Sequence, residues 1–135
     1  MPAHQLATQL ARLHAEGFNQ NINSQGYGSA NLTRRALEIF QHYMAVALLF
    51  GVQASELRSK LVCGHYDGRK SLSPSTRALY EAVYAVIGQS PSADKPLIRN
   101  DYEQEIDQYL ARIAADLKAD GKLVDAIAPV TVMLA

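Results

Sequence analysis

HYMAVALLFGVQASELRSKL, residues 42–61, decides how the middle of this 135-residue chain folds. Its first nine residues are largely apolar and predict the end of a buried helix, because a helix without a polar face has to be covered on all sides. Gly51 is typical of a helix end. Leu57 and Leu61, four residues apart, predict a short second helix over 54–62. The stretch therefore indicates a corner between two packed helices.

Helical patterns continue on the N-terminal side of this corner. Leu6, Leu10 and Leu13 form one apolar stripe, which predicts a helix over 3–16. The polar residues 18–31 that follow are expected to form a long loop, which in a compact domain is either functional or mobile. The central helix is then expected to begin near Asn31 or Thr33, both acceptable caps, and to run to Phe50.

On the C-terminal side of the corner, the residues that start and end helices are easier to identify. Ser73 followed by Pro74 is typical of a helix start, and Gly88 of a helix end. A further helix is expected from Asn100, which forms a capping-box-like pair with Glu103, to Gly121. Pro129 is expected to set off the last apolar stretch, which would dock on the core or on a partner.

The fold class follows from these segments. Strand signals are few, although the turn dipeptide Asp67-Gly68 predicts a small hairpin near residues 63–72. The sequence thus predicts one all-α domain over residues 1–135, a compact bundle of about five helices.

Composition narrows the function classes. Apolar residues make up 48% of the chain and the formal net charge is zero, so no global field draws the protein to nucleic acid or anionic lipid. Cys63 is the only cysteine, which excludes an internal disulfide and favours a cytoplasmic location. The longest apolar run, 44–52, is far shorter than the roughly 20 residues of a membrane span, so we expect no membrane partner.

Part of the corner resembles the helix-turn-helix of phage-repressor-like regulators. Ala47, Gly51, Val52 and Leu57 occupy the spacing that such a unit requires, although Lys60 stands where a further apolar anchor belongs. The resemblance covers about twenty residues and implies that Ser55, Glu56, Arg58 and Ser59 face a DNA groove. The other residues that could bind nucleic acid lie in a basic middle segment and would contact phosphate: Arg34, Arg35, Arg69, Lys70 and Arg77.

No catalytic or metal site and no cofactor is predicted. The glycines of residues 26–35 could cradle an anion ahead of a helix, but the segment matches no nucleotide fingerprint. Cys63 and His65 lack the further ligands that zinc requires. The acidic residues 101–107 alternate in sequence, so they do not share one helix face.

The interpretation drawn from these patterns is a small cytoplasmic, non-enzymatic protein that regulates through protein–protein contacts, as a homodimer or on another protein. A helix-turn-helix DNA-binding regulator, with residues 43–62 as the reader, is the alternative, and DNA is then the partner. Tyrosine suits interfaces because it joins an apolar body to a polar tip. The expected interface residues are Tyr80, Tyr84, Tyr102, Tyr109, Val132 and Leu134.

Overall fold

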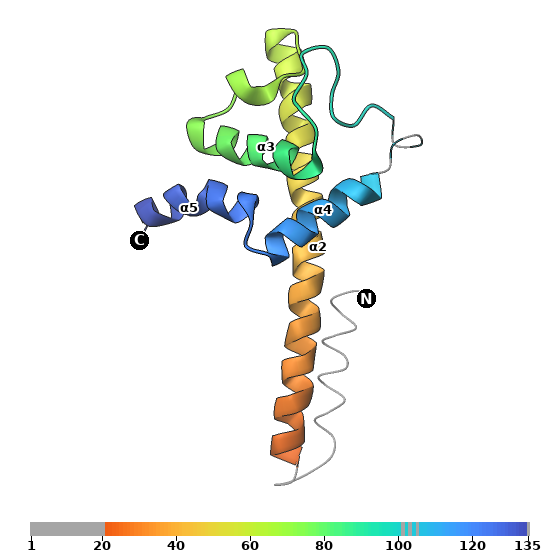
Figure 1. The fold of residues 1–135 in the computed structure, drawn as a ribbon, viewed down its shortest axis with the longest axis vertical. Helices are drawn as coiled ribbons and strands as arrows, with labels where there is room; N and C mark the ends of the chain where they lie inside the picture. The colour runs from red at the N-terminus through yellow and green to blue at the C-terminus, as the bar shows by residue number, and fades with distance from the viewer. Residues whose placement is uncertain (1–20, 101, 103, 105, 135) are drawn as a thin grey trace. The chain divides into compact units, whose positions relative to one another are not determined.

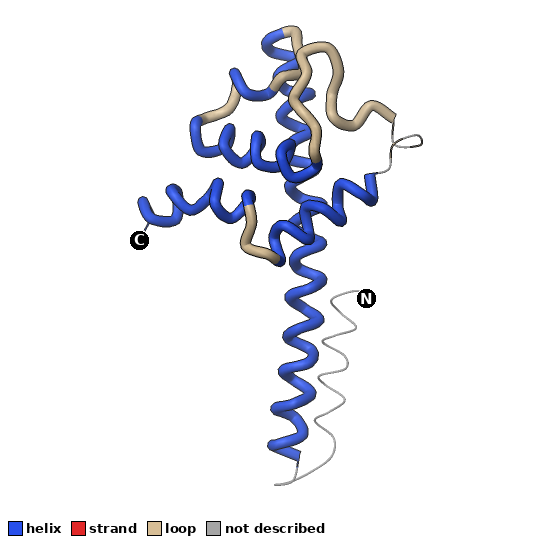
Figure 2. Tube along the Cα trace, viewed as in Figure 1, coloured by secondary structure: helices blue, strands red, loops and turns tan. Residues whose placement is uncertain are grey.

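A computed structural model describes residues 21–100, 102, 104 and 106–134 of the chain, and every described element is a helix or a loop (Figures 1 and 2). The expected all-α class is confirmed. The chain divides into two units, Met1–Gln41 and His42–Ala135. The described part of the first unit is helical from Asn21 onward. The helix expected over 3–16 lies outside the described residues.

Helix α2 spans Asn21–Cys63, and its length is the largest departure from expectation. Most of the loop expected over 18–31 is therefore helical, and Asn31 lies inside a helix instead of capping one. Gly26 and Gly28 lie within α2 as well. Since the free N–H groups of a helix are confined to its first turn, the anion cradle expected ahead of residue 31 does not form.

The corner expected at Gly51 is also absent, because α2 continues through it. The Ser55 hydroxyl donates to the carbonyl of Gly51 at 2.8 Å, four residues back, which is the spacing of a helical turn. Gly51 has no positive φ, unlike Gly64 and Gly88. Without a turn there are not two helices to form a helix-turn-helix unit, so the geometry required for DNA reading by residues 43–62 is missing.

After α2, a 3-10 helix, η2 (Gly68–Lys70), occupies the place of the expected hairpin. The Asp67 side chain accepts from the backbone N–H of Arg69 at 3.1 Å and caps this turn. Gly68 is buried, and an added Cβ would lie 3.2 Å from Cε2 of Tyr80. The Asp-Gly pair therefore makes a tight turn against a ring and does not connect two strands.

Helix α3, Pro74–Ile87, has the predicted boundaries. Ser73 caps it by accepting from the N–H of Thr76 at 3.4 Å, and Pro74 occupies its first turn. Gly88 ends it with a φ of 74°, a left-handed conformation that favours glycine. Arg112 adds a second C-terminal contact by donating to the carbonyl of Ile87 at 2.6 Å.

Helices α4 (Ile106–Lys118) and α5 (Lys122–Leu134) complete the second unit. Helix α4 starts later than expected: the Asn100 side chain accepts from the N–H of Tyr102 at 3.1 Å, in a turn that precedes the helix. Glu103, its expected capping partner, lies outside the described residues. Helix α5 continues through Pro129, which was expected to set off the last apolar stretch from the preceding residues.

The described hydrophobic core lies in the second unit, where α3, α4 and α5 are drawn beside the second half of α2 and α3 lies next to α5 (Figure 1). All four helices and the loop at Leu97 contribute to it. Its members are Ala45, Leu49, Val52, Tyr80, Val83, Tyr84, Ile87, Leu97, Ile113, Ala114 and Leu123.

Over Gly26–Cys63, α2 is long and apolar enough to cross a bilayer, judged by length and composition alone. This differs from the expectation based on the short apolar run 44–52, because the helix does not stop at Gly51. The core helix of a soluble protein or a signal sequence meets the same test, so the property by itself assigns no membrane.

Candidate functional site

A buried carboxylate is the most unusual polar group in the described core. Glu56, on α2, is 1% exposed. Its Oε1 accepts hydrogen bonds from the hydroxyls of Tyr80, at 3.1 Å, and of Tyr84, both on α3. Its Oε2 accepts from the backbone N–H of Leu97 at 2.8 Å. Three segments of the chain, α2, α3 and the loop at Leu97, thus meet at one side chain, and we call Glu56, Tyr80, Tyr84 and Leu97 the Glu56 cluster.

Burial determines the proton affinities within the Glu56 cluster. It raises the pKa of Glu56, and the hydrogen bonds from Tyr84, Leu97 and Tyr80 offset part of that effect. Burial, together with the adjacent carboxylate, raises the pKa of Tyr80 to about 12. The pKa of Tyr84 is raised further for the same reasons. Both tyrosines therefore remain protonated donors near neutral pH.

The Glu56 cluster continues into the segment after α2. The N–H of Gly68 donates to the hydroxyl of Tyr80 at 3.4 Å. Ser59, which is fully buried, donates to the carbonyl of Asp67 at 2.8 Å. Asp67 also pairs with Arg69 at 2.6 Å, and the hydrogen bond from that guanidinium lowers the pKa of Asp67. These bonds hold η2 against α2 and α3.

The chemistry open to Glu56 is limited by its surroundings. A general acid or base has to reach a reacting group directly or through a water molecule, whereas the Glu56 carboxylate is enclosed by three donors from its own chain. A buried charge is tolerated when it is hydrogen-bonded in this way. We therefore interpret the Glu56 cluster as a structural junction that fixes α3 and the loop at Leu97 on α2.

Cys63 and His65 do not form a site with other ligands. Among the described residues, no group of three or more His, Cys, Asp or Glu side chains is arranged to hold a metal ion. Cys63 is exposed, and Nδ1 of His65 is buried without a hydrogen-bond partner.

Two apolar hollows flank α2 in the second unit. The larger, of about 490 Å³, is lined by Val46, Leu49, Phe50, Gln53, Ile98, Arg99, Ile106 and Leu110. The smaller, of about 160 Å³, lies between α2 and α3, with Ala47 and Gly51 at its edge. Both are bounded mainly by aliphatic side chains. Neither brings together the titratable groups that a catalytic pocket requires.

The residues predicted to bind nucleic acid do not form the expected reader. Arg58 is exposed, but Glu56 and Ser59, expected to face a groove beside it, are buried in the core. The Ser55 hydroxyl donates its hydrogen bond to the carbonyl of Gly51, within α2. Arg69 is paired with Asp67, and Arg77 donates to the carbonyl of Leu72 at 3.3 Å. Arg34, Arg35 and Lys70 are exposed on the helices α2 and η2.

The expected interface residues fall into three groups. Tyr80 and Tyr84 are buried inside this chain and serve the Glu56 cluster. Tyr102 is 94% exposed, and Tyr109 is half-buried on α4. Val132 and Leu134 lie in α5, with side chains outside the described ones.

Comparison with known proteins identifies the family. The family model for aromatic amino acid lyases matches residues 4–85. A phenylalanine ammonia-lyase of Nostoc punctiforme is 57% identical over 114 residues, which cover 84% of this chain and 20% of that protein. An aromatic ammonia-lyase of Loktanella atrilutea is 35% identical over 130 residues, 89% of this chain and 24% of that protein.

This chain therefore belongs to the aromatic amino acid lyase family. It spans between a fifth and a quarter of the length of these two relatives. The prediction of a non-enzymatic regulatory or binding protein is wrong, because the matching family consists of lyases. The alternative of a helix-turn-helix regulator is wrong for the same reason, and also because α2 has no turn at Gly51.

Proposed function

We propose that this chain forms part of an ammonia-lyase that acts on an aromatic amino acid. The observation that supports this most strongly is its 57% identity, across 84% of the chain, with a phenylalanine ammonia-lyase. Such an enzyme breaks the Cα–N bond of its substrate and removes a proton from Cβ. The products are ammonia and an α,β-unsaturated aryl acid.

Within such an enzyme, the described residues supply a helical framework. The Glu56 cluster joins α2 to α3 and to the loop at Leu97, and the core of the second unit packs around these elements. A framework of this kind holds distant functional groups in place, because positioning within a fraction of an ångström contributes much of an enzyme's rate. We assign no described residue to the chemical step.

A chimeric enzyme tests this proposal. The Nostoc relative is produced with its matching 114 residues replaced by those of this chain. We expect the chimera to release ammonia from phenylalanine and to form an absorbing, conjugated aryl acid. A chimera that folds, assembles like the parent enzyme and releases no ammonia from phenylalanine, tyrosine or histidine would contradict the proposal.

A matched variant of the chimera shows whether the framework matters. Val83 is 1% exposed in the core, whereas Glu81, also on α3, is exposed. A Val83→Asp chimera should lose both its folding cooperativity and its activity, because it buries an unpaired charge. A Glu81→Gln chimera should keep both.

We further infer a cytoplasmic location. The single cysteine excludes an internal disulfide and is typical of proteins in a reducing compartment. Fractionation of the native cells tests this inference. Recovery of the protein in the soluble fraction is expected, and recovery in salt-washed membranes would contradict it.

A further inference from the structure

A third hollow in the second unit differs from the two described above because its lining is mainly polar. It has a volume of about 90 Å³ and lies at the loop that follows α3. Its lining includes the hydrogen-bond donors Ser90, Ser92, Lys95 and Arg99. Arg99 also lines the larger apolar hollow, of about 490 Å³. We call these two spaces the polar hollow and the apolar hollow, and one cationic residue borders both.

The apolar hollow has the composition of a small-molecule site. Such sites have mostly apolar walls, a few polar groups that orient the ligand, and volumes of about 300–1,000 Å³. The described polar residues at this hollow are Gln53 and Arg99, and the others are aliphatic or aromatic. Phe50 is 64% exposed and Val46 is 38% exposed. An apolar ligand would remove part of these two side chains from water, which favours its binding.

The backbone that carries Arg99 is held in place before any ligand binds. The N–H of Arg99 donates to Oε1 of Gln104, and the amide of Gln104 donates to the carbonyl of Leu97 at 2.9 Å. The N–H of Leu97 in turn donates to Glu56 at 2.8 Å. A ligand at Arg99 therefore does not have to order this loop, a cost that weakens binding to mobile segments.

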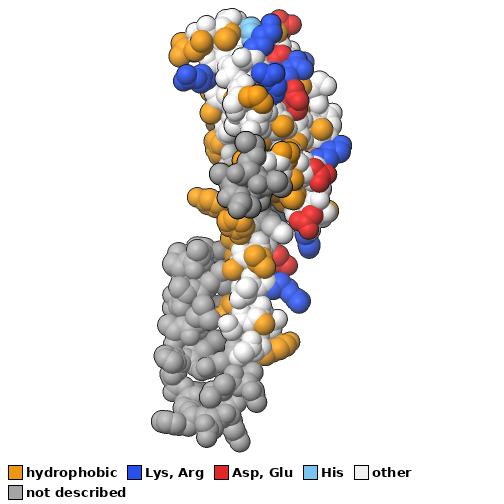
Figure 3. All heavy atoms as spheres, turned by 90° about the vertical axis from the view of Figure 1, so that its left-hand side faces the viewer, with side chains coloured by type: hydrophobic (Ala, Val, Ile, Leu, Met, Phe, Trp, Pro, Cys, Tyr) orange, Lys and Arg blue, Asp and Glu red, His pale blue; other side chains and the backbone are white. Residues whose placement is uncertain are grey.

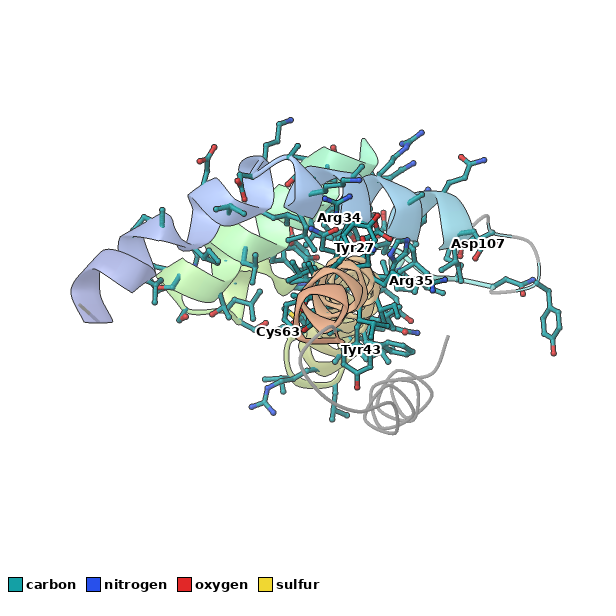
Figure 4. All side chains as sticks on the ribbon, turned by 90° about the horizontal axis from the view of Figure 1, so that it is seen from below. Tyr27, Arg34, Arg35, Tyr43, Cys63 and Asp107 are labelled. Atoms are coloured by element: carbon teal, nitrogen blue, oxygen red, sulfur yellow. The ribbon has the colours of Figure 1, made fainter. Side chains whose placement is uncertain are left out.

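The positive charges of Arg99 and Lys95 are available to an anion. Both side chains are exposed, and no carboxylate among the described residues pairs with either of them, since the salt bridge found there joins Arg69 to Asp67. Figure 4 shows Asp107 at the beginning of α4, away from α2, and it lines neither the polar nor the apolar hollow. Because a guanidinium can bind both oxygens of a carboxylate at once, Arg99 is suited to that group.

We propose that the two hollows together bind an aryl carboxylate. The ring lies in the apolar hollow, where Phe50 offers an aromatic side chain to pack against. The carboxylate accepts hydrogen bonds from the guanidinium of Arg99, and Lys95 supplies a second cation from the polar hollow. The choice of an aryl group rests on the proposed function, because the product of that reaction is an α,β-unsaturated aryl acid. We assign this site a role in binding only.

General attraction of anions to a basic surface would not explain such binding. The formal net charge of the chain is zero. Figure 3 shows basic and acidic side chains interspersed over the described part of the face that it draws. A broad field of one sign is what collects counter-ions on a protein surface. Binding of an aryl carboxylate should therefore depend on Arg99 in particular and not on any exposed arginine.

The first test measures the carboxylate contact by isothermal titration calorimetry of the full chain with phenylpropenoate. Phenylpropenamide, a neutral analogue of nearly the same shape, should bind about 10-fold more weakly or worse. Arg99→Gln should weaken binding of the acid by about the same factor and should bind acid and amide alike, because the group that distinguishes them is gone. Arg58→Gln makes the same chemical change at an exposed position of α2 outside both hollows and should leave the affinity unchanged.

The second test measures the ring contact. Val46→Trp places a larger side chain at the apolar hollow and should weaken binding of phenylpropenoate about 10-fold, because it takes the space of the ring. Leu61→Trp introduces the same residue at a position that is 87% exposed and outside both hollows, and it should have no effect. Circular dichroism should show equal helix content in both variants. Hexanoate, which has a carboxylate and no ring, should bind more weakly than phenylpropenoate.

Three results would overturn this proposal: no binding at the highest ligand concentration reached, equal affinity of the wild-type chain for acid and amide, and an affinity that Arg99→Gln leaves unchanged. Equal binding of hexanoate would contradict the choice of an aryl ligand. These measurements need no catalysis, so their outcome is separate from that of the chimera. An inactive chimera with a chain that binds phenylpropenoate contradicts the proposed function alone, whereas an active chimera with a chain that does not bind contradicts this inference alone.

Discussion

The backbone N–H of Leu97 donates to Oε2 of Glu56, 41 residues earlier in the chain, at 2.8 Å. This bond ties an irregular loop to the C-terminal part of α2. The loop is held again by Gln104, whose side-chain amide donates to the carbonyl of Leu97 at 2.9 Å. Leu97 can enter the core because both of its backbone polar groups are hydrogen-bonded, as burial of a loop residue demands.

Replacing Glu56 by Gln should destabilise the chain. Gln keeps the shape of Glu but replaces one acceptor oxygen by an amide donor, so either the Leu97 N–H faces another donor or the two tyrosine hydroxyls lose their shared acceptor. We expect a loss of about 1–3 kcal/mol in the free energy of unfolding, the usual cost of a buried group left unsatisfied. Urea denaturation followed by circular dichroism measures it.

Glu81→Gln is the matched control for this prediction. Glu81 lies on α3 near the tyrosines in sequence, but its side chain is exposed. Exposed substitutions usually change stability by less than about 0.5 kcal/mol. Equal effects of the two variants would show that the Glu56 cluster does not stabilise the fold.

The stability that Glu56 provides should fall as pH rises. Burial raises its pKa in the folded state above the ordinary value of 4.5, so the folded protein holds the proton more tightly than the unfolded chain. The contribution is complete below pH 4.5 and is lost as pH rises through the folded pKa. The difference in unfolding free energy between wild type and Glu56→Gln, measured at several pH values, should therefore decrease upward from pH 4.5.

Comparing wild type with Glu56→Gln separates the effect of Glu56 from that of Asp67. The hydrogen bond from Arg69 lowers the pKa of Asp67, and Asp67 therefore contributes stability that is lost as pH falls. That contribution is present in both proteins and cancels in the difference, apart from the repulsion between Asp67 and Glu56, which is the last of the causes that shift the pKa of Glu56. A difference that stays level or grows with pH would mean that Glu56 is not held in a desolvated site.

The boundaries of α3 could be predicted from the sequence, because they are determined by residues at the two ends of the helix. Ser73 and Gly88 satisfy backbone groups at the ends of α3, and Pro74 has no N–H to leave unpaired in the first turn. These effects are local to the ends of the helix. Gly51 misled the prediction because its helix-ending tendency is weak beside the packing of a long helix. The buried stripe through Ala45, Leu49, Val52 and Ser59 keeps one phase across Gly51. That continuity was the available signal for a single helix.

The Glu56 cluster could not be predicted from the sequence, for a different reason. Glu56 is buried on α2, although a charged residue normally indicates an exposed face. Only the tertiary fold supplies the donors of Tyr80, Tyr84 and Leu97. The pairing of Tyr80 with Tyr84 at a four-residue spacing was visible in the sequence, but their polar tips were expected at an interface. Family membership required comparison with other proteins, because neither helical patterning nor composition specifies a reaction.

Gly51→Ala should stabilise the chain. Gly51 lies inside α2 with free space around a Cβ, and alanine is better than glycine in a helix interior by about 1 kcal/mol. Thermal unfolding followed by circular dichroism measures this change. A loss of stability would indicate a turn at Gly51 and restore the corner expected from the sequence.

Gly68→Ala should have the opposite sign. An added Cβ would lie 3.2 Å and 3.3 Å from two atoms of the buried Tyr80 ring. That ring is held by the Glu56 cluster, so it cannot move away freely, and overpacking of this kind costs about 1–3 kcal/mol. The free energies of unfolding of Gly68→Ala and Gly51→Ala are measured side by side. Both variants add the same methyl group, one against the Tyr80 ring and one into free space. A neutral result at Gly68 would mean that Tyr80 shifts without penalty.

Asp116 on α4 should be required for the start of α5. Its Oδ1 accepts from the N–H of Lys122 at 3.1 Å, and its Oδ2 accepts from the N–H of Leu123 at 2.9 Å. Asp116 thereby caps two free donors of α5 from a neighbouring helix, and Leu123 is 1% exposed in the core. Loss of a helix cap costs about 0.5–2 kcal/mol. We expect Asp116→Ala to lose this amount and Asp116→Asn, which retains one acceptor, to lose less. Amide hydrogen exchange should show the loss of protection concentrated at Lys122 and Leu123; equal protection in wild type and Asp116→Ala would show that other groups cap α5.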